Sequence, residues 1–388
     1  MGQPILAAAA FQAALTPRST PLKRFPFLDW MRGLAVLIMI ECHTFNSFAR
    51  LDIRNGGPYV LSQFVGGMAA PLFLFMAGMT FGFQMESLER REPNRWKRWQ
   101  FALRRAGYIM AIAFAFRICN WIASIPRPEI AEITKVDILN SMALAMGAFA
   151  IAAVFDGRRR VRFALGAALA IAVLAPLIES YSWKGTPQLI VEYLAPGPNR
   201  GRFPFFPCAA YVGFGLAAGA IVKRAAADYM DRLMQWFALI GFVAIFTAQY
   251  FSNIPFSLYA TPDFWRSSPA LVFIRTGISL AMLASAYLWT EYGAAARWSW
   301  MQALGQTSLL VYWVHVMLVY GNIAKHWKRT LSIPETALAF AIVTALMVAL
   351  AAARLAWKPR KKQPDYAPTP GTPSPGTPAP GTLVTRAH

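Results

Sequence analysis

Long apolar segments alternate with short polar ones along most of the chain. Ten of these segments are apolar and long enough to cross a bilayer as helices, which takes about 20 residues each. They cover residues 28–49, 59–84, 101–125, 136–155, 161–180, 204–223, 233–252, 270–291, 302–325 and 334–356. The pattern predicts an all-α polytopic membrane protein with about ten transmembrane helices lying in a lipid bilayer.

Composition agrees with a membrane protein and excludes several other classes. Of the 388 residues 56% are hydrophobic and 14% charged, and the mean hydropathy is +0.39. The net charge of +20 comes from short basic segments between apolar ones, which is the positive-inside pattern and not a basic domain for nucleic acid. Three cysteines without metal-binding spacing and four dispersed histidines predict no bound metal and no disulfide framework.

The basic clusters follow even-numbered apolar segments, namely the second, fourth, sixth and tenth. By the positive-inside rule this alternation places both termini in the cytoplasm. One loop departs from the rule, because Lys325, Lys328 and Arg329 follow the ninth segment on the expected outer side. The Ala- and Arg-rich composition favours a bacterial origin, and hence the inner membrane.

Three regions are expected: a cytoplasmic segment over 1–26, a transmembrane domain over 27–357 and a tail over 358–388. The tail is first basic and then repeats Thr-Pro with Gly between Pro368 and Pro378. It has no apolar face to bury, so we predict that it is disordered or partly polyproline II. It serves either as a solubilising end or as a docking segment.

Arg32 and His43 are eleven positions apart within the first apolar segment. At about 100° per residue this spacing is three turns plus roughly 20°, so both side chains lie on one helix face, about 16 Å apart along the axis. Ionisable groups inside a bilayer are costly and rare, which makes each one a candidate functional residue.

The predicted topology sorts the other membrane-embedded polar residues by depth. An inner basic group consists of Arg32, Arg104 and Arg105. An outer polar group consists of His43, Asp137, His315, Arg117 and Arg275, with Asn46 and Asn140 as further substrate-binding candidates. Each has a structural alternative, since arginines also anchor helices at the membrane surface and a buried histidine also serves in packing.

Two groups at opposite depths suit the transfer of an acyl group across the membrane. Arginine forks at the inner side would hold the phosphates of an acyl-CoA, whose pantetheine arm is comparable in length to the rise from Arg32 to His43. An imidazole in the outer half would take a proton from an acceptor hydroxyl or amine, or take the acyl group itself. Asp137, if close enough, would orient the ring, and His315 is the second catalytic histidine candidate.

Four motifs in order resemble the transmembrane acyltransferase superfamily. The first is Asp29-Trp30-Met31-Arg32-Gly33 with His43, which resembles an Asp-x-x-Arg-Gly opening and an Arg-x10-His motif. The others are the apolar stretch 70–78 ending in Ala77-Gly78, the segment Asp137-Ile138-Leu139-Asn140, and Leu304-Gly305-Gln306-Thr307-Ser308-Leu309 followed by Tyr312-Trp313 and His315. The resemblance covers about residues 24–325 and is closest to the heparan-α-glucosaminide N-acetyltransferase-like branch, which is related to acyltransferase family three.

The resemblance implies transfer of an acetyl or other acyl group from a cytoplasmic acyl-CoA to a carbohydrate or glycan acceptor on the far side. It makes His43 the essential histidine and Arg32 the donor-side arginine, and it leaves a homodimer open. The large luminal domain of the animal enzymes has no counterpart in this chain, which puts a heparan-type acceptor in doubt.

Two other classes of function remain as alternatives. A secondary transporter or flippase for an anionic metabolite or lipid-linked sugar would also use intramembrane Arg, His and Asp. The two halves of the sequence show no paired repeat of the kind common in transporters. The second alternative is a non-catalytic scaffold that recruits partners through its proline-rich tail.

Overall fold

The computed structural model describes residues 25–124, 129–197, 202–255, 259, 263–293 and 299–357. These residues form helices joined by short loops and contain no β-strand. The α-helices are α2 (Pro26–Phe48), α3 (Gly57–Gly66), α4 (Ala69–Glu89), α5 (Arg95–Ala123), α6 (Ile138–Phe149), α7 (Gly157–Ser180), α8 (Gln188–Leu194), α9 (Phe205–Arg224), α10 (Met230–Ser252), α11 (Pro269–Tyr292), α12 (Trp300–Gln306), α13 (Ser308–Tyr320) and α14 (Ile333–Ala356). Four 3₁₀ turns, η1 (Ile130–Thr134), η2 (Ala150–Val154), η3 (Ala227–Tyr229) and η4 (Asn322–Trp327), lie between them.

Each of the ten predicted segments contains a helix, so the prediction of an all-α, multi-pass membrane protein is confirmed. Within the described residues seven helices pass for spans by length and composition, with α3 and α4 forming one, and the bent pair α12–α13 makes an eighth. The other two segments are α2, which carries three charged side chains, and α6, which has 12 residues before η2 continues it. The predictions for residues 1–24 and for the tail over 358–388 lie outside the described residues.

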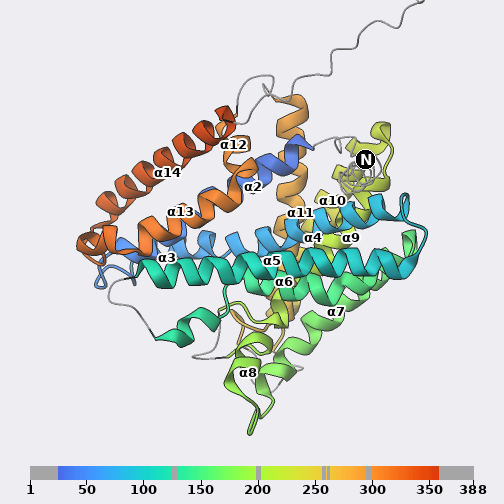
Figure 1. Ribbon diagram of the computed structural model, residues 1–388, viewed down its shortest axis with the longest axis horizontal. Helices are drawn as coiled ribbons and strands as arrows, with labels where there is room; N and C mark the ends of the chain where they lie inside the picture. The colour runs from blue at the N-terminus through green and yellow to red at the C-terminus, as the bar shows by residue number, and fades with distance from the viewer. Residues whose placement is uncertain are drawn as a thin grey trace, which may run out of the picture.

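Small residues bring α4 and α9 into backbone contact. A Cβ on Gly78 would lie 2.1 Å from the carbonyl oxygen of Val212, and one on Gly215 would lie 1.9 Å from that of Phe75. Close approach of this kind is typical of membrane helices, where dispersion contacts between backbones replace the hydrophobic effect. Figure 1 shows α4 and α5 lying along the long axis, with α13 and α14 at the upper left beside α2.

A second backbone contact joins α2 to α12. A Cβ on Gly33 would lie 1.8 Å from the carbonyl oxygen of Met301, and a Cβ on Gly305 would lie 1.8 Å from that of Asp29. Both glycines belong to the motifs described above: Gly33 directly follows Arg32, and Gly305 lies two residues before the helix break at Thr307. The contact therefore fixes the start of the bent pair against the helix that carries His43.

Near the loop after α4, buried charges are paired. The Arg160 guanidinium is fully buried and bonds Glu86 and Glu89, and Arg224 of α9 bonds the same two carboxylates. Asp156, in the loop before α7, accepts a 2.8 Å hydrogen bond from Arg98, which lowers the pKa of its carboxyl group. Arg160, one of the basic residues after the fourth apolar segment, therefore ties α7 to α4. Removal of either partner would leave a buried charge uncompensated.

Candidate active site between two adjoining cavities

The structure brings together the two histidines that the sequence places at similar depth. Nδ1 of His43 on α2 lies 2.9 Å from Nε2 of His315 on α13, and the two rings stack with an interplanar angle of 12°. His315 is completely buried, and its Nδ1 lies 2.8 Å from the carbonyl oxygen of Val311. The edge of the Tyr320 ring also contacts His43.

These contacts assign the protons of the neutral pair. A carbonyl oxygen only accepts, so Nδ1 of His315 carries a hydrogen and donates it to Val311. In a neutral imidazole the other nitrogen is then unprotonated, so Nε2 of His315 accepts a hydrogen bond from Nδ1 of His43. His43 is left with an unprotonated Nε2, which has no hydrogen-bond partner among the described residues. A lone pair in this position suits a base or a nucleophile.

A break in the ninth predicted segment delivers His315 to this place. The helix is interrupted at Thr307, and α12 and α13 meet at 88°, where the sequence predicts one continuous span over 302–325. The Thr307 hydroxyl donates to the Ala303 carbonyl at 2.8 Å, which satisfies one acceptor at the end of α12. The expectation of a straight ninth span is therefore wrong, because the α2–α12 contact fixes one half of the segment while α13 turns towards His43.

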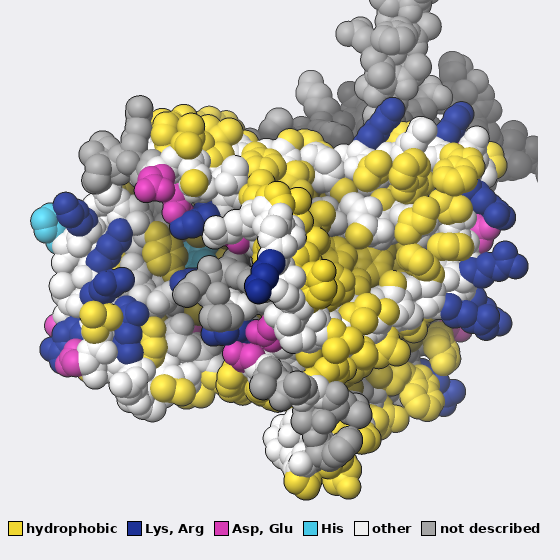
Figure 2. All heavy atoms as spheres, turned by 90° about the horizontal axis from the view of Figure 1, so that it is seen from below, with side chains coloured by type: hydrophobic (Ala, Val, Ile, Leu, Met, Phe, Trp, Pro, Cys, Tyr) yellow, Lys and Arg dark blue, Asp and Glu magenta, His cyan; other side chains and the backbone are white. Residues whose placement is uncertain are grey.

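His43 lines a cavity of about 570 Å³, named the histidine cavity here. Its wall also includes Asn46, Asp137 and Arg275, three of the substrate-side or catalytic candidates from sequence. Charged side chains gather around a hollow in the face shown in Figure 2, within which a histidine is visible. The remaining lining comes from α2, α3, α4, α6, α9 and α13 and from the segments between α8 and α9 and before α11.

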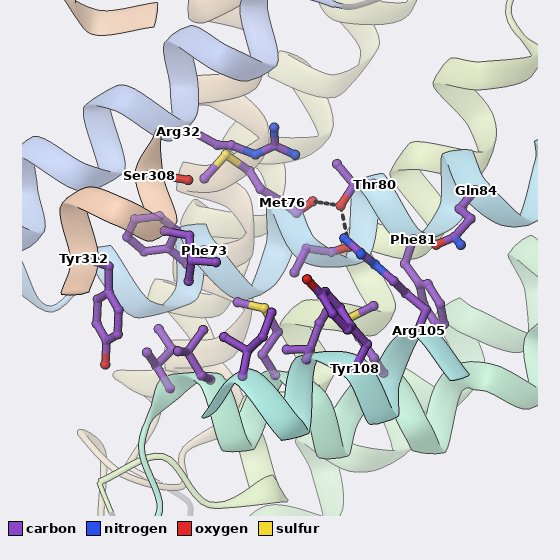
Figure 3. Close-up of a pocket in the computed structure, with 18 of the residues that line it drawn as sticks. Arg32, Phe73, Met76, Thr80, Phe81, Gln84, Arg105, Tyr108, Ser308 and Tyr312 are labelled. Carbon is purple, nitrogen blue, oxygen red and sulfur yellow. Dashed lines mark hydrogen bonds between the residues drawn. The ribbon is translucent and has the colours of Figure 1, made fainter. Parts of the chain in front are cut away.

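A second cavity, of about 480 Å³, lies between α2, α4, α5, α6 and α13 and is named the arginine cavity here. Arg32 and Arg105 project into it from opposite sides, together with Thr80 and Tyr108, and its remaining wall is mainly apolar (Figure 3). Arg32 also forms a 3.4 Å ion pair with the buried Asp29 one turn earlier. Of the predicted inner group, Arg32 and Arg105 are thus brought together, whereas Arg104 is exposed and lies outside the wall of this cavity.

The two cavities adjoin, because Met39, Phe73, Ile138 and Tyr312 line both of them. Met39 lies between Arg32 and His43 on α2, so one face of this helix borders first one cavity and then the other, as the eleven-residue spacing predicts. The arrangement offers two guanidinium groups on one side, an imidazole on the other and a mainly apolar shared wall between them.

Asp137 takes a different place from the one proposed for it at the sequence level. Its Oδ1 accepts hydrogen bonds from the backbone N–H groups of Leu139 and Asn140, at 2.9 and 3.0 Å, so it caps the start of α6. Its Oδ2 is buried and has no hydrogen-bond partner within the described part of the chain. No hydrogen bond joins this carboxylate to either histidine, and the group that orients His43 is His315 instead.

The other outer residues contribute to this corner in different ways. Asn140 is fully buried and completes the capping box with Asp137, while Arg117 of α5 bonds the backbone carbonyl of Glu132. The Asn46 side chain is 3.5 Å from the Tyr320 hydroxyl. Asn140 and Arg117 thus support the Asp137 cap, and Asn46 and Arg275 border the cavity itself.

Sequence reasoning missed four side chains that line or border the histidine cavity: Tyr312, Tyr320, Arg202 and Trp265. Tyr312 lies in the quoted motif three residues before His315, and Tyr320 is on the same helix, so both were within reach of helical spacing. Arg202 and Trp265 lie in loops, and their positions depend on tertiary contacts that no local pattern carries. Among the described residues no three His, Cys, Asp or Glu side chains are grouped as metal ligands would be.

Comparison with known protein families identifies the family of this chain. Residues 25–353 match the family described as Acyltransferase domain, acyltransferase family three. The chain belongs to acyltransferase family three. No curated protein matches it. In this family-three acyltransferase the matched range begins just before α2 and ends within α14, so it includes both cavities and the histidine pair. The match confirms a multi-pass membrane acyltransferase, a broader statement than the heparan-α-glucosaminide branch suggested by the motifs.

Proposed function

We propose that this acyltransferase moves an acetyl or other acyl group from acyl-CoA to a saccharide hydroxyl or amine at His43. The observation that carries the proposal is the His43–His315 hydrogen bond, in which the free nitrogen of His43 is left beside a cavity. That cavity adjoins another bordered by two arginines. The sequence-level alternative of a transporter has no support from the family match.

The arginine cavity fits the acyl donor. Arg32 and Arg105 offer planar forks for phosphate oxygens, and the Tyr108 ring stands beside Arg105. The apolar side chains between them and Tyr312 suit the methylene and methyl groups of a pantetheine arm. In this placement the thioester reaches the shared wall of the two cavities, while the phosphates stay at the basic, cytoplasmic side of the protein. We place the protein in a bacterial inner membrane with both termini in the cytoplasm.

His43 acts as the general base in this proposal. Its Nε2 removes the proton of the acceptor hydroxyl or amine as the acceptor oxygen or nitrogen attacks the thioester carbon. The carbon–sulfur bond breaks, and the proton passes from His43 to the departing CoA thiolate. His315 accepts the hydrogen bond from Nδ1 of His43 throughout and stabilises the imidazolium formed in between. Acylation of His43 itself, followed by transfer, uses the same nitrogen.

Asp137 and Asn46 are the acceptor contacts in the proposal. The unpartnered Oδ2 of Asp137 costs free energy while it is buried alone, and a saccharide hydroxyl would satisfy it. Trp265 is 59% exposed and lines the same cavity, where its indole offers a flat apolar surface to a sugar ring.

The test uses purified protein in detergent with acetyl-CoA labelled on the acetyl carbon. A 4-nitrophenyl glucoside and the corresponding glucosaminide are offered separately, so that transfer to oxygen and to nitrogen are distinguished. We expect His43→Ala to lower CoA release and transfer of the label to the acceptor by about 100-fold or more, the usual range for loss of a general base. His326→Ala is the matched control, because His326 lies in η4 and is exposed; equal loss in both variants, or wild-type turnover in His43→Ala, would contradict the proposal.

A further inference from the structure

The charged side chains lining the histidine cavity are three arginines and one carboxylate: Arg202, Arg266, Arg275 and Asp137. Two of the four have charged neighbours of their own. Arg266 forms a 3.3 Å ion pair with Asp263, and Asp137 interacts with the charge of Arg117. Arg202 and Arg275 form no ion pair with any carboxylate in the described part of the chain, so the cavity carries an excess of positive charge.

Arg275 lies where an unbalanced charge is expensive. It is on α11, half-buried among membrane helices, and its Nη2 atom lies against the backbone of Gly67, where a Cβ would be 3.2 Å away. Its polar neighbours, Cys208 and Tyr211 of α9, are both uncharged. An arginine in such surroundings is normally paired with a carboxylate. An arginine that borders a cavity and has no carboxylate partner marks a position where a ligand would bind.

Arg202 stands on the reactive side of the same cavity. It is exposed and close enough to His43 and Tyr320 for its charge to act on both. A ligand group held by Arg202 is therefore a neighbour of the lone pair on His43, while Arg275 lines the cavity beside α9 and Gly67.

We infer that the acceptor saccharide carries an anionic group, a carboxylate or a phosphate, which Arg275 and Arg202 bind in the histidine cavity. This inference rests on the proposed function for the assignment of that cavity to the acceptor, and it names the acceptor's chemical class. Charge-assisted hydrogen bonds from guanidinium to carboxylate or phosphate are among the strongest available to a protein. Trp265 supplies an apolar surface for the sugar ring, and the anionic substituent meets the arginines.

The experiment measures binding without any acyl donor, so it does not depend on turnover. Equilibrium dialysis of the detergent-solubilised full chain compares 4-nitrophenyl β-glucuronide, which has a carboxylate, with 4-nitrophenyl β-glucoside, which is neutral. Glucose 1-phosphate is the phosphate arm. We expect the better of the two anionic sugars to bind at least about tenfold more tightly than the glucoside, and that arm identifies the anion.

The variants locate the effect. Arg275→Gln and Arg202→Gln should each weaken binding of the preferred anionic sugar about tenfold and leave the glucoside unaffected, while Arg275→Lys should retain part of the preference. Arg50→Gln is the matched control, because Arg50 is exposed, paired with Asp52 and outside the cavity wall. Arg202→Gln removes an exposed side chain, so it reports even if Arg275→Gln fails to fold.

Three results would overturn the inference: no preference for either anionic sugar, a preference that survives in both variants, or weakened binding of CoA in place of the sugar. The last result would assign the two arginines to the donor. Failure of the proposed function is recognised separately, because the dialysis contains no acyl donor and reports binding of the anionic sugar whether or not the protein transfers an acyl group to it.

Discussion

At the residue scale the proposed mechanism depends on one hydrogen bond between two helices far apart in the sequence. Hydropathy and topology put His43 and His315 at similar depth, because depth follows from position within a span. Their contact, and the proton assignment that leaves Nε2 of His43 free, depend on the Val311 carbonyl and were beyond any local pattern. The same limit explains Asp137, whose residue type and position suit a catalytic carboxylate but whose Oδ1 caps α6.

If His315 positions His43, then replacing it should affect the chemical step and spare donor binding. We expect His315→Ala to lower kcat at least about tenfold, because Nδ1 of His43 loses the acceptor that selects its tautomer. The KM for acetyl-CoA should stay within about twofold of wild type, since Arg32 and Arg105 are untouched.

His315→Gln is the informative companion, because the glutamine side chain offers an oxygen that accepts the same hydrogen bond. It should recover part of the lost kcat. Steady-state kinetics with labelled acetyl-CoA measure both variants; a wild-type kcat in His315→Ala, or a change confined to KM, would show that the second histidine has only a packing role.

At the element scale hydropathy located the helical segments and missed the bend. The helical segments can be found from sequence because each one forms its backbone hydrogen bonds within itself and is apolar over a length that spans the bilayer. No proline lies at the 88° bend between α12 and α13, so the sequence carries no local signal for it. It follows from a contact with another helix, in which Gly33 and Gly305 let the backbones of α2 and α12 touch.

This contact predicts a specific sensitivity to one methyl group. In Gly305→Ala the new Cβ would lie 1.8 Å from the Asp29 carbonyl oxygen, so α12 must move away from α2. We expect a loss of about 1–3 kcal/mol in stability, together with a lower kcat, because α13 and His315 follow α12.

Gly107→Ala is the matched control within another membrane helix. A Cβ on Gly107 meets no atom within 4 Å, and alanine is the better helix former by about 1 kcal/mol. Thermal unfolding in detergent and the transfer assay should therefore show Gly107→Ala as at least as stable as wild type and equally active. Equal behaviour of the two alanine variants would mean that the α2–α12 contact does not hold the site together.

At the scale of the whole molecule the two residue groups inferred from topology correspond to two adjoining cavities. Arg32 and Arg105 border one, and His43, Asp137 and Arg275 border the other. Sequence could place these groups at different depths because charge clusters report the sides of a membrane. It could not show that the cavities share a wall, or that Arg104 lies outside it, because these facts depend on how α5 is rotated against α2 and α4.

The proposed function gives the reaction a direction. In this proposal the donor enters from the side of the basic loops, the acceptor occupies the cavity near the opposite loops, and the acyl group passes the shared wall at Tyr312. The proposed reaction therefore requires transfer across the membrane and not only within one compartment.

The most direct test uses inverted and right-side-out membrane vesicles from cells that produce the protein, with labelled acetyl-CoA added outside. We expect that in inverted vesicles, whose cytoplasmic face is outward, saccharides retained inside the vesicles become labelled, and that in right-side-out vesicles they do not. Labelling should be present with His326→Ala and lost with His43→Ala. Labelling that is independent of His43, or that occurs equally in both vesicle orientations, would contradict transmembrane transfer at the histidine pair.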